Sequence, residues 1–249
     1  MAEKTRGIRV EQGPKRVRAY LGGELVADTH HPLLVWEIPN YPAYYFPRAD
    51  VRTGLLTPST RTEHSPSRGE ARFFHLKGGD RRVEDAAWEY PDSPIEALRD
   101  LVRLDWKSMS EWFEEDEPVY THTRDPYKRV DILASSRHVR IELDGVTIAE
   151  SSQPRILYET SLPPRYYLPL TDVRMDLLRR SDTQSHCPYK GTAGYWSVDT
   201  GQAVHEDIVW IYRTPLPESQ KIAGLVCLYN EKVDLYLDGE LQERPRTHF

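Results

Sequence analysis

The side chains of this chain that could react are concentrated in one short segment, residues 185–196. The segment reads SHCPYKGTAGYW and places a histidine, a thiol, a phenol and an ammonium within the five positions from His186 to Lys190. The thiolate form of cysteine is a nucleophile, and a nearby cation favours it over the thiol. Lys190 follows Cys187 by three residues across a Pro-Tyr turn that could fold its ammonium back toward the sulfur. The spacing makes Cys187 a candidate nucleophile with Lys190 beside it.

A structural interpretation of Cys187 has equal weight. Free cysteine is among the most buried residue types and packs as a small apolar side chain. On this view CPYKG is a tight turn that leads into an aromatic strand, and the sulfur is inert. The second cysteine, Cys227, lies in the apolar run GLVCLY, where an unreactive buried thiol is expected. Two cysteines are too few for a disulfide framework or for a metal site built from cysteines alone.

Two charged groups near this segment also have competing interpretations. Lys190 could bind an anion such as a phosphate or a carboxylate, or it could be a solvated lysine at a loop tip. Glu159 could act as a general base or hold a donor group of a substrate. A structural ion pair with an arginine is the more common role for such a carboxylate. We take Cys187, Lys190 and Glu159 as the candidate catalytic residues.

Aromatic and polar side chains supply the candidate ligand contacts. Tyr167 and Trp210 could line a pocket for a planar ligand, and packing on a sheet face explains them about as well. The full set of candidate ligand-binding residues is Tyr189, Tyr167, His186, Thr183 and Trp210. The histidines do not have a zinc-ligand spacing, and the sequence contains neither a serine nucleophile motif nor a glycine-rich phosphate loop. We therefore expect no metal and no cofactor.

The elements that must position these residues occur twice, because the chain is a doubled unit. An offset of 122 residues aligns Glu37 with Glu159, and it holds without a gap as far as His64 and His186. The same offset pairs Val17 with Val139, Asp50 with Asp172, Trp88 with Trp210 and Tyr90 with Tyr212. A constant offset of this length indicates two copies of one domain. The predicted parts are an N-terminal arm at 1–15, a first repeat at 16–118, a linker at 119–137 and a second repeat at 138–249, with the repeats packed as a pseudo-dimer.

Each repeat is predicted to be mainly β. Apolar residues alternate with polar ones before Asp144-Gly145, and a two-residue Asp-Gly loop between alternating strands is typical of a hairpin. VDLYLDGELQE at 233–243 predicts another hairpin. SPIEALRDLVRL, starting at Ser93, predicts a helix with a capping box, and a weaker version lies at 219–226. We expect a β-rich α+β fold of two small antiparallel sheet or barrel domains, each with one covering helix.

Comparison of the two copies separates scaffold from chemistry. HSPSRGEARFF at 64–74 aligns with HCPYKGTAGYW at 186–196, and both keep the histidine, the proline and the glycine at position 69 or 191. The first copy has Ser65 for Cys187, Ser67 for Tyr189 and Arg68 for Lys190. The thiol, the phenol and the ammonium are therefore dispensable for the fold, although Arg68 keeps the positive charge. We expect the first copy to have lost the site and to serve as a scaffold or wall.

Both halves resemble the domain-of-unknown-function 427 family, which is sometimes labelled nucleotidyltransferase-like. The second half carries YLP at 167–169, SDT at 181–183, CPYKG at 187–191 and YW at 195–196, and the first half carries EDAAWEYPDSP at 84–94. The resemblance covers almost the whole chain and implies a compact β-rich domain with a pocket beside the cysteine motif. It implies no settled activity, and the sequence lacks the paired metal-binding aspartates of nucleotidyl transfer.

Bulk composition narrows the classes of function. The net charge of −6 does not require a nucleic-acid partner, and no apolar run reaches the length of a membrane span. The N-terminus lacks the apolar core of a signal peptide, so we expect a cytoplasmic protein. We predict a pocket in the second repeat for a small anionic or nucleotide-like ligand, with Cys187 as the reacting group if the protein is an enzyme. The alternatives are a non-catalytic structural or interaction module, in which the turn is purely structural, and a thiol redox sensor.

Overall fold

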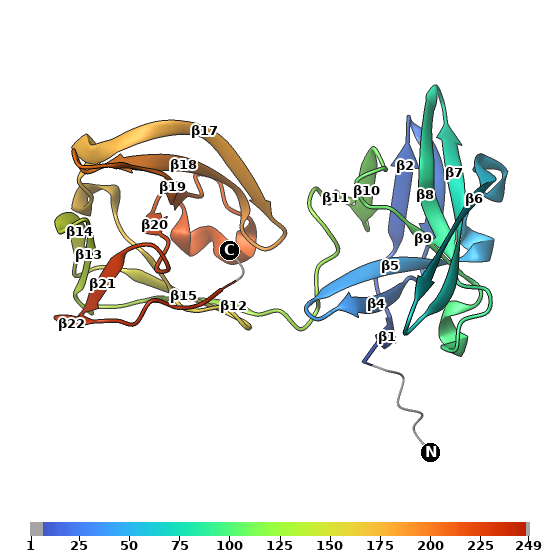
Figure 1. Cartoon of the computed structure of the whole chain (residues 1–249), viewed down its shortest axis with the longest axis horizontal. Coiled ribbons are helices and arrows are strands. Elements are labelled where there is room, and N and C mark those ends of the chain that lie inside the picture. The colour runs from blue at the N-terminus through green and yellow to red at the C-terminus, as the bar shows by residue number, and fades with distance from the viewer. Residues whose placement is uncertain (1–6, 248–249) are drawn as a thin grey trace, which may run out of the picture. The chain divides into compact units, whose positions relative to one another are not determined.

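The computed structural model describes residues 7–247, and the chain divides into two compact units between Asp125 and Pro126 (Figure 1). Both units consist of antiparallel strands joined by turns and short 3₁₀ segments. The mainly β class is therefore confirmed. Within the described residues, no helical segment has the length and hydropathy that a membrane-spanning helix requires.

The first unit contains a seven-stranded and a four-stranded sheet. The strand order is β1-β4-β5-β9-β8-β7-β6 in the larger sheet and β11-β10-β2-β3 in the smaller one. The strands are β1 (Arg9–Gln12), β2 (Val17–Leu21), β3 (Glu24–Thr29), β4 (Leu33–Ile38), β5 (Tyr41–Pro47), β6 (Leu56–Ser65), β7 (Gly69–Gly78), β8 (Arg81–Glu89), β9 (Leu101–Leu104), β10 (Glu111–Glu114) and β11 (Glu117–Pro118).

The second unit repeats this arrangement with shorter sheets. Their strand orders are β12-β15-β16, β17-β18-β19-β20 and β14-β13-β21-β22. The strands are β12 (Val130–Ala134), β13 (Val139–Leu143), β14 (Val146–Ser151), β15 (Arg155–Glu159), β16 (Arg165–Tyr167), β17 (Leu178–Cys187), β18 (Gly191–Asp199), β19 (Val204–Ile211), β20 (Val226–Leu228), β21 (Asp234–Leu237) and β22 (Glu240–Leu241). An antiparallel bridge between Leu168 and Val226 continues the first two sheets in the order of the larger sheet of the first unit. The tandem repeat is confirmed, and in both units the described strands form open sheets rather than closed barrels.

Each repeat begins with an edge strand. Strand β1 lies in the segment expected as an N-terminal arm, and it pairs with β4. Strand β12 lies in the segment expected as a linker, and it pairs with β15 in the same way. Since β1 and β12 are related by the offset of 122, the edge strand belongs to the repeated unit.

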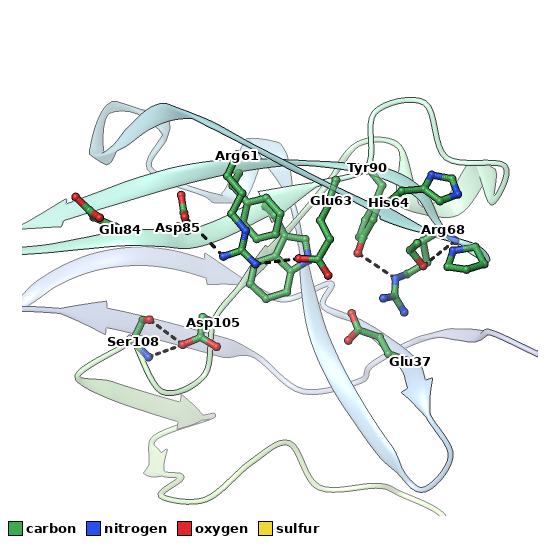
Figure 2. A pocket seen from close by; sticks show the side chains of 15 residues that line it. Glu37, Arg61, Glu63, His64, Arg68, Glu84, Asp85, Tyr90, Asp105 and Ser108 are labelled. Atoms are coloured by element: carbon green, nitrogen blue, oxygen red, sulfur yellow. Dashed lines mark hydrogen bonds and ion pairs between the residues drawn. The ribbon is translucent and has the colours of Figure 1, made fainter.

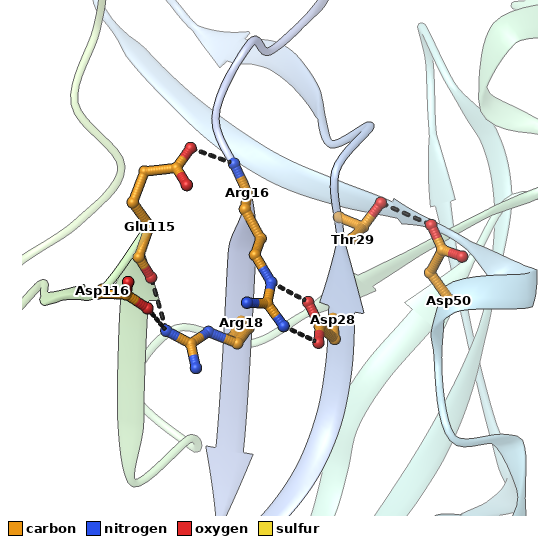
Figure 3. Close-up of polar contacts among 7 residues, drawn as sticks. All are labelled: Arg16, Arg18, Asp28, Thr29, Asp50, Glu115 and Asp116. Carbon is orange, nitrogen blue, oxygen red and sulfur yellow. Dashed lines mark hydrogen bonds and ion pairs between the residues drawn. The ribbon is translucent and has the colours of Figure 1, made fainter.

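Polar contacts are repeated at the same offset. The Thr29 hydroxyl donates to the Asp50 carboxylate at 2.6 Å (Figure 3), and the Ser151 hydroxyl donates to Asp172 at the same distance. These bonds tie the strand β3 or β14 to the 3₁₀ segment that follows β5 or β16. Figure 3 also shows the Arg16 guanidinium bound to both oxygens of Asp28, at 2.8 and 2.5 Å.

The predicted hairpins are confirmed, and their loops adopt left-handed backbone conformations. The loop residues of the hairpin β13–β14, Asp144 and Gly145, have φ of 51° and 75°. Asp238 and Gly239 in the hairpin β21–β22 have φ of 55° and 88°. Two positive φ values in succession match the right-handed twist of the flanking strands, which explains why Asp-Gly is favoured there.

The prediction of one covering helix in each repeat is wrong. The segment predicted as a helix from Ser93 forms only the 3₁₀ helix η3 (Glu96–Leu98) and then strand β9. Its counterpart forms the 3₁₀ helix η6 (Pro217–Ile222), followed by β20. Strand β9 pairs with both β5 and β8, and Val102 is fully buried between them. A twelve-residue helix is marginal on its own, so these sheet hydrogen bonds outweigh its helix propensity.

Two apolar clusters cover opposite faces of the larger sheet in each unit. Neighbouring residues of β7 belong to different clusters, Phe73 to one and Phe74 to the other, as the alternation of a strand requires. One cluster fills the space toward the smaller sheet. The other includes Tyr45 and Leu98 in the first unit, and Tyr167 and Cys227 in the second. The candidate site residues lie beside this second cluster.

Candidate functional site

A turn at residues 188–190 joins β17 to β18 and holds the two central candidates. Cys187 is the last residue of β17, and Lys190 ends the turn. Gly191 opens β18 with φ of 96°, and Gly69 has φ of 91° at the equivalent position. A left-handed conformation is costly for residues with a Cβ, so the glycine is required by the backbone in both copies.

The backbone carbonyls of the turn accept hydrogen bonds from η6 and from the residue that precedes it. The Leu216 amide donates to the Lys190 carbonyl at 3.1 Å, and the Ser219 hydroxyl donates to the Tyr189 carbonyl at 3.0 Å. The Tyr189 side chain is buried. These contacts fix the backbone on which Cys187 and Lys190 are displayed.

Lys190 and Glu159 form an ion pair that is almost inaccessible to solvent. The Lys190 ammonium donates to the Glu159 carboxylate, and the exposed fractions of the two side chains are 12% and 7%. Burial alone would lower the pKa of Lys190, but the Cys187 sulfur and the Glu159 carboxylate outweigh it and raise the pKa above its usual value. Lys190 is therefore not a solvated lysine, and the partner of Glu159 is a lysine rather than an arginine.

The two thiols lie in different environments. Cys187 is partly exposed and interacts with the Lys190 ammonium. Cys227 is completely buried, and its burial raises the pKa of the thiol to about 12. The interpretation of Cys227 as an unreactive buried thiol agrees with this environment.

Tyr212 is a neighbour of the cluster that sequence reasoning did not include. Its side chain is buried, and burial raises the pKa of its hydroxyl well above the usual value. The negative forms of Cys187 and Glu159 add to this effect, which places the phenol near both groups. The signal that could have identified it was its alignment with Tyr90, since a tyrosine stands at this position in both copies.

Tyr167 and Trp210 pack together in the apolar cluster beside the site. The Trp210 indole donates to the Tyr167 hydroxyl at 3.1 Å, and their rings meet edge to face at 6.3 Å between centroids. Their exposed fractions are 1% and 7%. In this conformation both rings contribute more to the core than to any open surface.

His186 and Thr183 are exposed on strand β17, and their hydrogen bonds go to other partners. The His186 ring bonds the Thr192 hydroxyl at 3.0 Å across the hairpin. The Thr183 hydroxyl donates to Asp207 at 2.6 Å. The structure therefore brings Cys187, Lys190 and Glu159 together without these two residues. In the part of the chain that the structure describes, no group of three or more histidine, cysteine, aspartate or glutamate side chains could hold a metal ion.

The equivalent residues of the first repeat are arranged differently. Glu37 pairs with Arg103 at 3.0 Å and accepts a hydrogen bond from the Tyr45 hydroxyl. Arg68, at the position of Lys190, donates instead to the Tyr90 hydroxyl at 3.1 Å. A cavity of about 670 Å³ opens beside these residues (Figure 2). The cavity lies in the repeat that we expected to have lost the site.

The fold and the doubled motif define a tandem of β-rich domains. A family model described as a domain of unknown function (DUF427) matches residues 9–115 and 131–239, and the chain belongs to this family. Each matched region corresponds to one repeat. No curated protein matches the chain.

Proposed function

We propose that the second repeat is a small-molecule site in which Cys187 is the reacting group and Lys190 and Glu159 control its proton. The observation that carries the proposal is the contact of one nearly buried ammonium with both a partly exposed sulfur and a carboxylate. Three such groups, two beside one turn and the third from strand β15, make a site in which a thiolate can be stabilised.

The charges of the cluster suit proton transfer inside it. With the thiol protonated, Lys190 and Glu159 neutralise each other. If the thiol proton moves to Glu159, the thiolate replaces the carboxylate as the partner of Lys190, and the net charge of the cluster does not change. A poorly solvated site favours a step that leaves no uncompensated charge. The thiolate would then attack an electrophilic carbon of the ligand, and the leaving group would depart with the proton held by Glu159.

The same ion pair bears on the class of ligand. An anionic or nucleotide-like ligand must compete with Glu159 for the ammonium. A compact ligand with an electrophilic carbon and no requirement for Lys190 as an anion site fits the pair better. The ligand class that we favour for the second repeat is therefore a small electrophile.

A purely structural turn is the second candidate, and one observation favours it. The backbone of the turn is already attached to Leu216, which precedes η6, and to Ser219 within η6. On this hypothesis the ion pair of Lys190 and Glu159 completes the attachment, and Cys187 fills space beside it. The protein would then be a non-catalytic binding or interaction module.

Alkylation of the two thiols separates these hypotheses. Iodoacetamide is applied across the neutral pH range, and mass spectrometry follows Cys187 and Cys227 separately. We expect Cys187 to react at least about a hundredfold faster than Cys227, because only a thiolate that is accessible is alkylated. If Cys187 is alkylated as slowly as Cys227, the nucleophile hypothesis is wrong and the structural turn is preferred.

Two variants test the electrostatic coupling directly. Lys190→Met removes the cation and should lower the alkylation rate of Cys187 at neutral pH by about tenfold. Glu159→Gln removes the anion that competes for the ammonium and should raise this rate. A merely structural role would move both rates in the same direction, because either variant would loosen the turn. Circular dichroism checks that each variant is folded.

A further inference from the structure

The cavity of the first repeat has no role in the function proposed for the second, and its chemistry is different. It occupies about 670 Å³, within the range of small-molecule sites. Its lining includes Ser65, Arg68, Phe73, Trp88, Tyr90 and Glu37. Two of these, Ser65 and Arg68, stand at the positions of Cys187 and Lys190. The segment that lost the cysteine motif thus still faces a cavity.

One substitution changes which cation Glu37 pairs with. Position 103 in strand β9 is an arginine that pairs with Trp88, whereas the residue of strand β20 that pairs with the equivalent Trp210 is Cys227. The Arg103 guanidinium lies 3.0 Å from Glu37 and 4.4 Å from the centroid of the Trp88 ring. The charge of Glu37 is therefore neutralised by Arg103 from strand β9, and Glu37 does not need Arg68 as an ion-pair partner.

The positive charge of Arg68 is consequently not neutralised by an ion pair within the described residues. Among residues 7–247 it has no carboxylate within ion-pair distance, and its side-chain hydrogen bond goes to the neutral Tyr90 hydroxyl. Figure 2 shows its guanidinium on the cavity side, facing the region of Glu37. Glu37, Arg103 and Arg68 together carry a net charge of +1, which a single anionic group would cancel.

Aromatic rings form one wall of the same cavity. Phe73 and Trp88 lie 5.4 Å apart between centroids, inclined at 33°, and Tyr90 lies under the Arg68 guanidinium at 5.4 Å. Such a wall favours a planar apolar body. Carboxylates from Glu63, Glu84, Asp85 and Asp105 also line the cavity, so a ligand with several negative charges would be repelled.

We propose that the first-repeat cavity binds a small planar molecule that carries one carboxylate, with Arg68 as the anchor for the carboxylate and Trp88 beside the ring. The guanidinium is suited to this group because it can donate two parallel hydrogen bonds to a carboxylate. The binding needs neither Cys187 nor any covalent step.

The test uses phenylacetate as the probe and compares it with phenylacetamide and phenethylamine, which keep the ring but not the negative charge. Binding is followed in the full chain by the indole N–H NMR signals, and Trp88→Phe identifies the signal of Trp88. We expect phenylacetate to shift that signal at millimolar concentration and to bind about tenfold or more tightly than either analogue. Comparable shifts with the uncharged amide would overturn the proposal.

Three variants place the binding at Arg68. Arg68→Met should weaken phenylacetate by about tenfold or more, and Arg68→Lys should retain part of the affinity because it keeps the charge. Arg72→Met is the matched control, since Arg72 is exposed in the same strand region, pairs with Asp92 and does not line the cavity. The proposal is wrong if Arg68→Met leaves the affinity unchanged, or if Arg72→Met weakens binding as much as Arg68→Met does.

Discussion

In the second repeat Glu159 pairs with Lys190, whereas in the first repeat the equivalent Glu37 pairs with Arg103 and leaves Arg68 to a tyrosine hydroxyl. The strand order around the two sites is the same, and both turns end in a glycine with positive φ. The partner of the carboxylate therefore depends on whether strand β9 or β20 supplies an arginine at that position. In the first repeat Arg103, a side chain outside the motif, holds the carboxylate that in the second repeat pairs with the cation of the motif.

Removal of the cation from each repeat should have unequal effects on the stability of the two units. Lys190→Met should destabilise the second unit by about 3 kcal/mol, because it leaves Glu159 buried without its partner. Arg68→Met should cost the first unit less than about 1 kcal/mol, because Glu37 keeps Arg103 and Tyr45. Urea unfolding, with hydrogen exchange measured separately in β17–β19 and β6–β8, gives the free energy of unfolding of each unit.

A double variant is the control for this prediction. Glu159→Gln with Lys190→Met removes both charges and should recover most of the loss, since no uncompensated charge remains. Equal costs for Lys190→Met and Arg68→Met would mean that the two cations have equivalent partners, in conflict with the structure.

The internal duplication could be predicted from the sequence because both copies retain the residues that their backbone conformation requires. The Asp-Gly hairpins and the turn glycines follow from local conformational preferences, and the structure contains all of them. The prediction of a covering helix was wrong because local preferences do not determine the structure of that segment. Its capping and periodicity were local signals, whereas strand β9 depends on pairing with β5 and β8, which both lie outside the segment that carries those signals.

The candidate site could be predicted only in part. Cys187, Lys190 and Glu159 were chosen by residue type and doubling, and the structure brings them together. The role of Arg103 could not be predicted, because its contact with Glu37 joins two strands separated by β5 in the larger sheet. Local patterns do not contain such long-range neighbours. For the same reason, the cavity in the first repeat had no sequence signal.

The turn glycines provide a second, smaller test, in which the two repeats should behave alike. Gly191→Ala and Gly69→Ala should each destabilise their unit by about 1–2 kcal/mol, since both residues have φ above 90°. Gly69→Ala should be slightly more destabilising than Gly191→Ala. A Cβ at position 69 would lie 3.3 Å from Pro94, whereas a Cβ at position 191 would lie 3.5 Å from its nearest neighbour, Leu216. Thermal unfolding of each variant measures the effect. A neutral result in either repeat would contradict the shared turn geometry.

The smallest expected difference between the repeats appears at alkaline pH and comes from Cys227. The residue equivalent to Cys227 in the first repeat is Arg103, because each pairs with the matching tryptophan of the neighbouring strand, so only the second unit buries a thiol there. Burial raises the pKa of Cys227 from 9.0 to about 12, so the folded state keeps the thiol protonated where the unfolded state loses its proton. A raised pKa in the folded state contributes stability below pH 9 that is lost as the pH rises toward 12.

Between pH 9 and pH 10 the unfolded state loses the thiol proton that the folded state keeps, whereas the buried tyrosines, with a usual pKa of 10.0, contribute equally to the wild type and to a variant without the thiol. The thiol should account for about 1 kcal/mol of the unfolding free energy that the second unit loses across this window. Cys227→Ala lowers stability at every pH through the lost packing, but it should remove this part of the pH dependence. Urea unfolding of both proteins at the two pH values measures the difference. Parallel losses in the wild type and the variant would show that another group is responsible, and that the buried thiol does not distinguish the repeats.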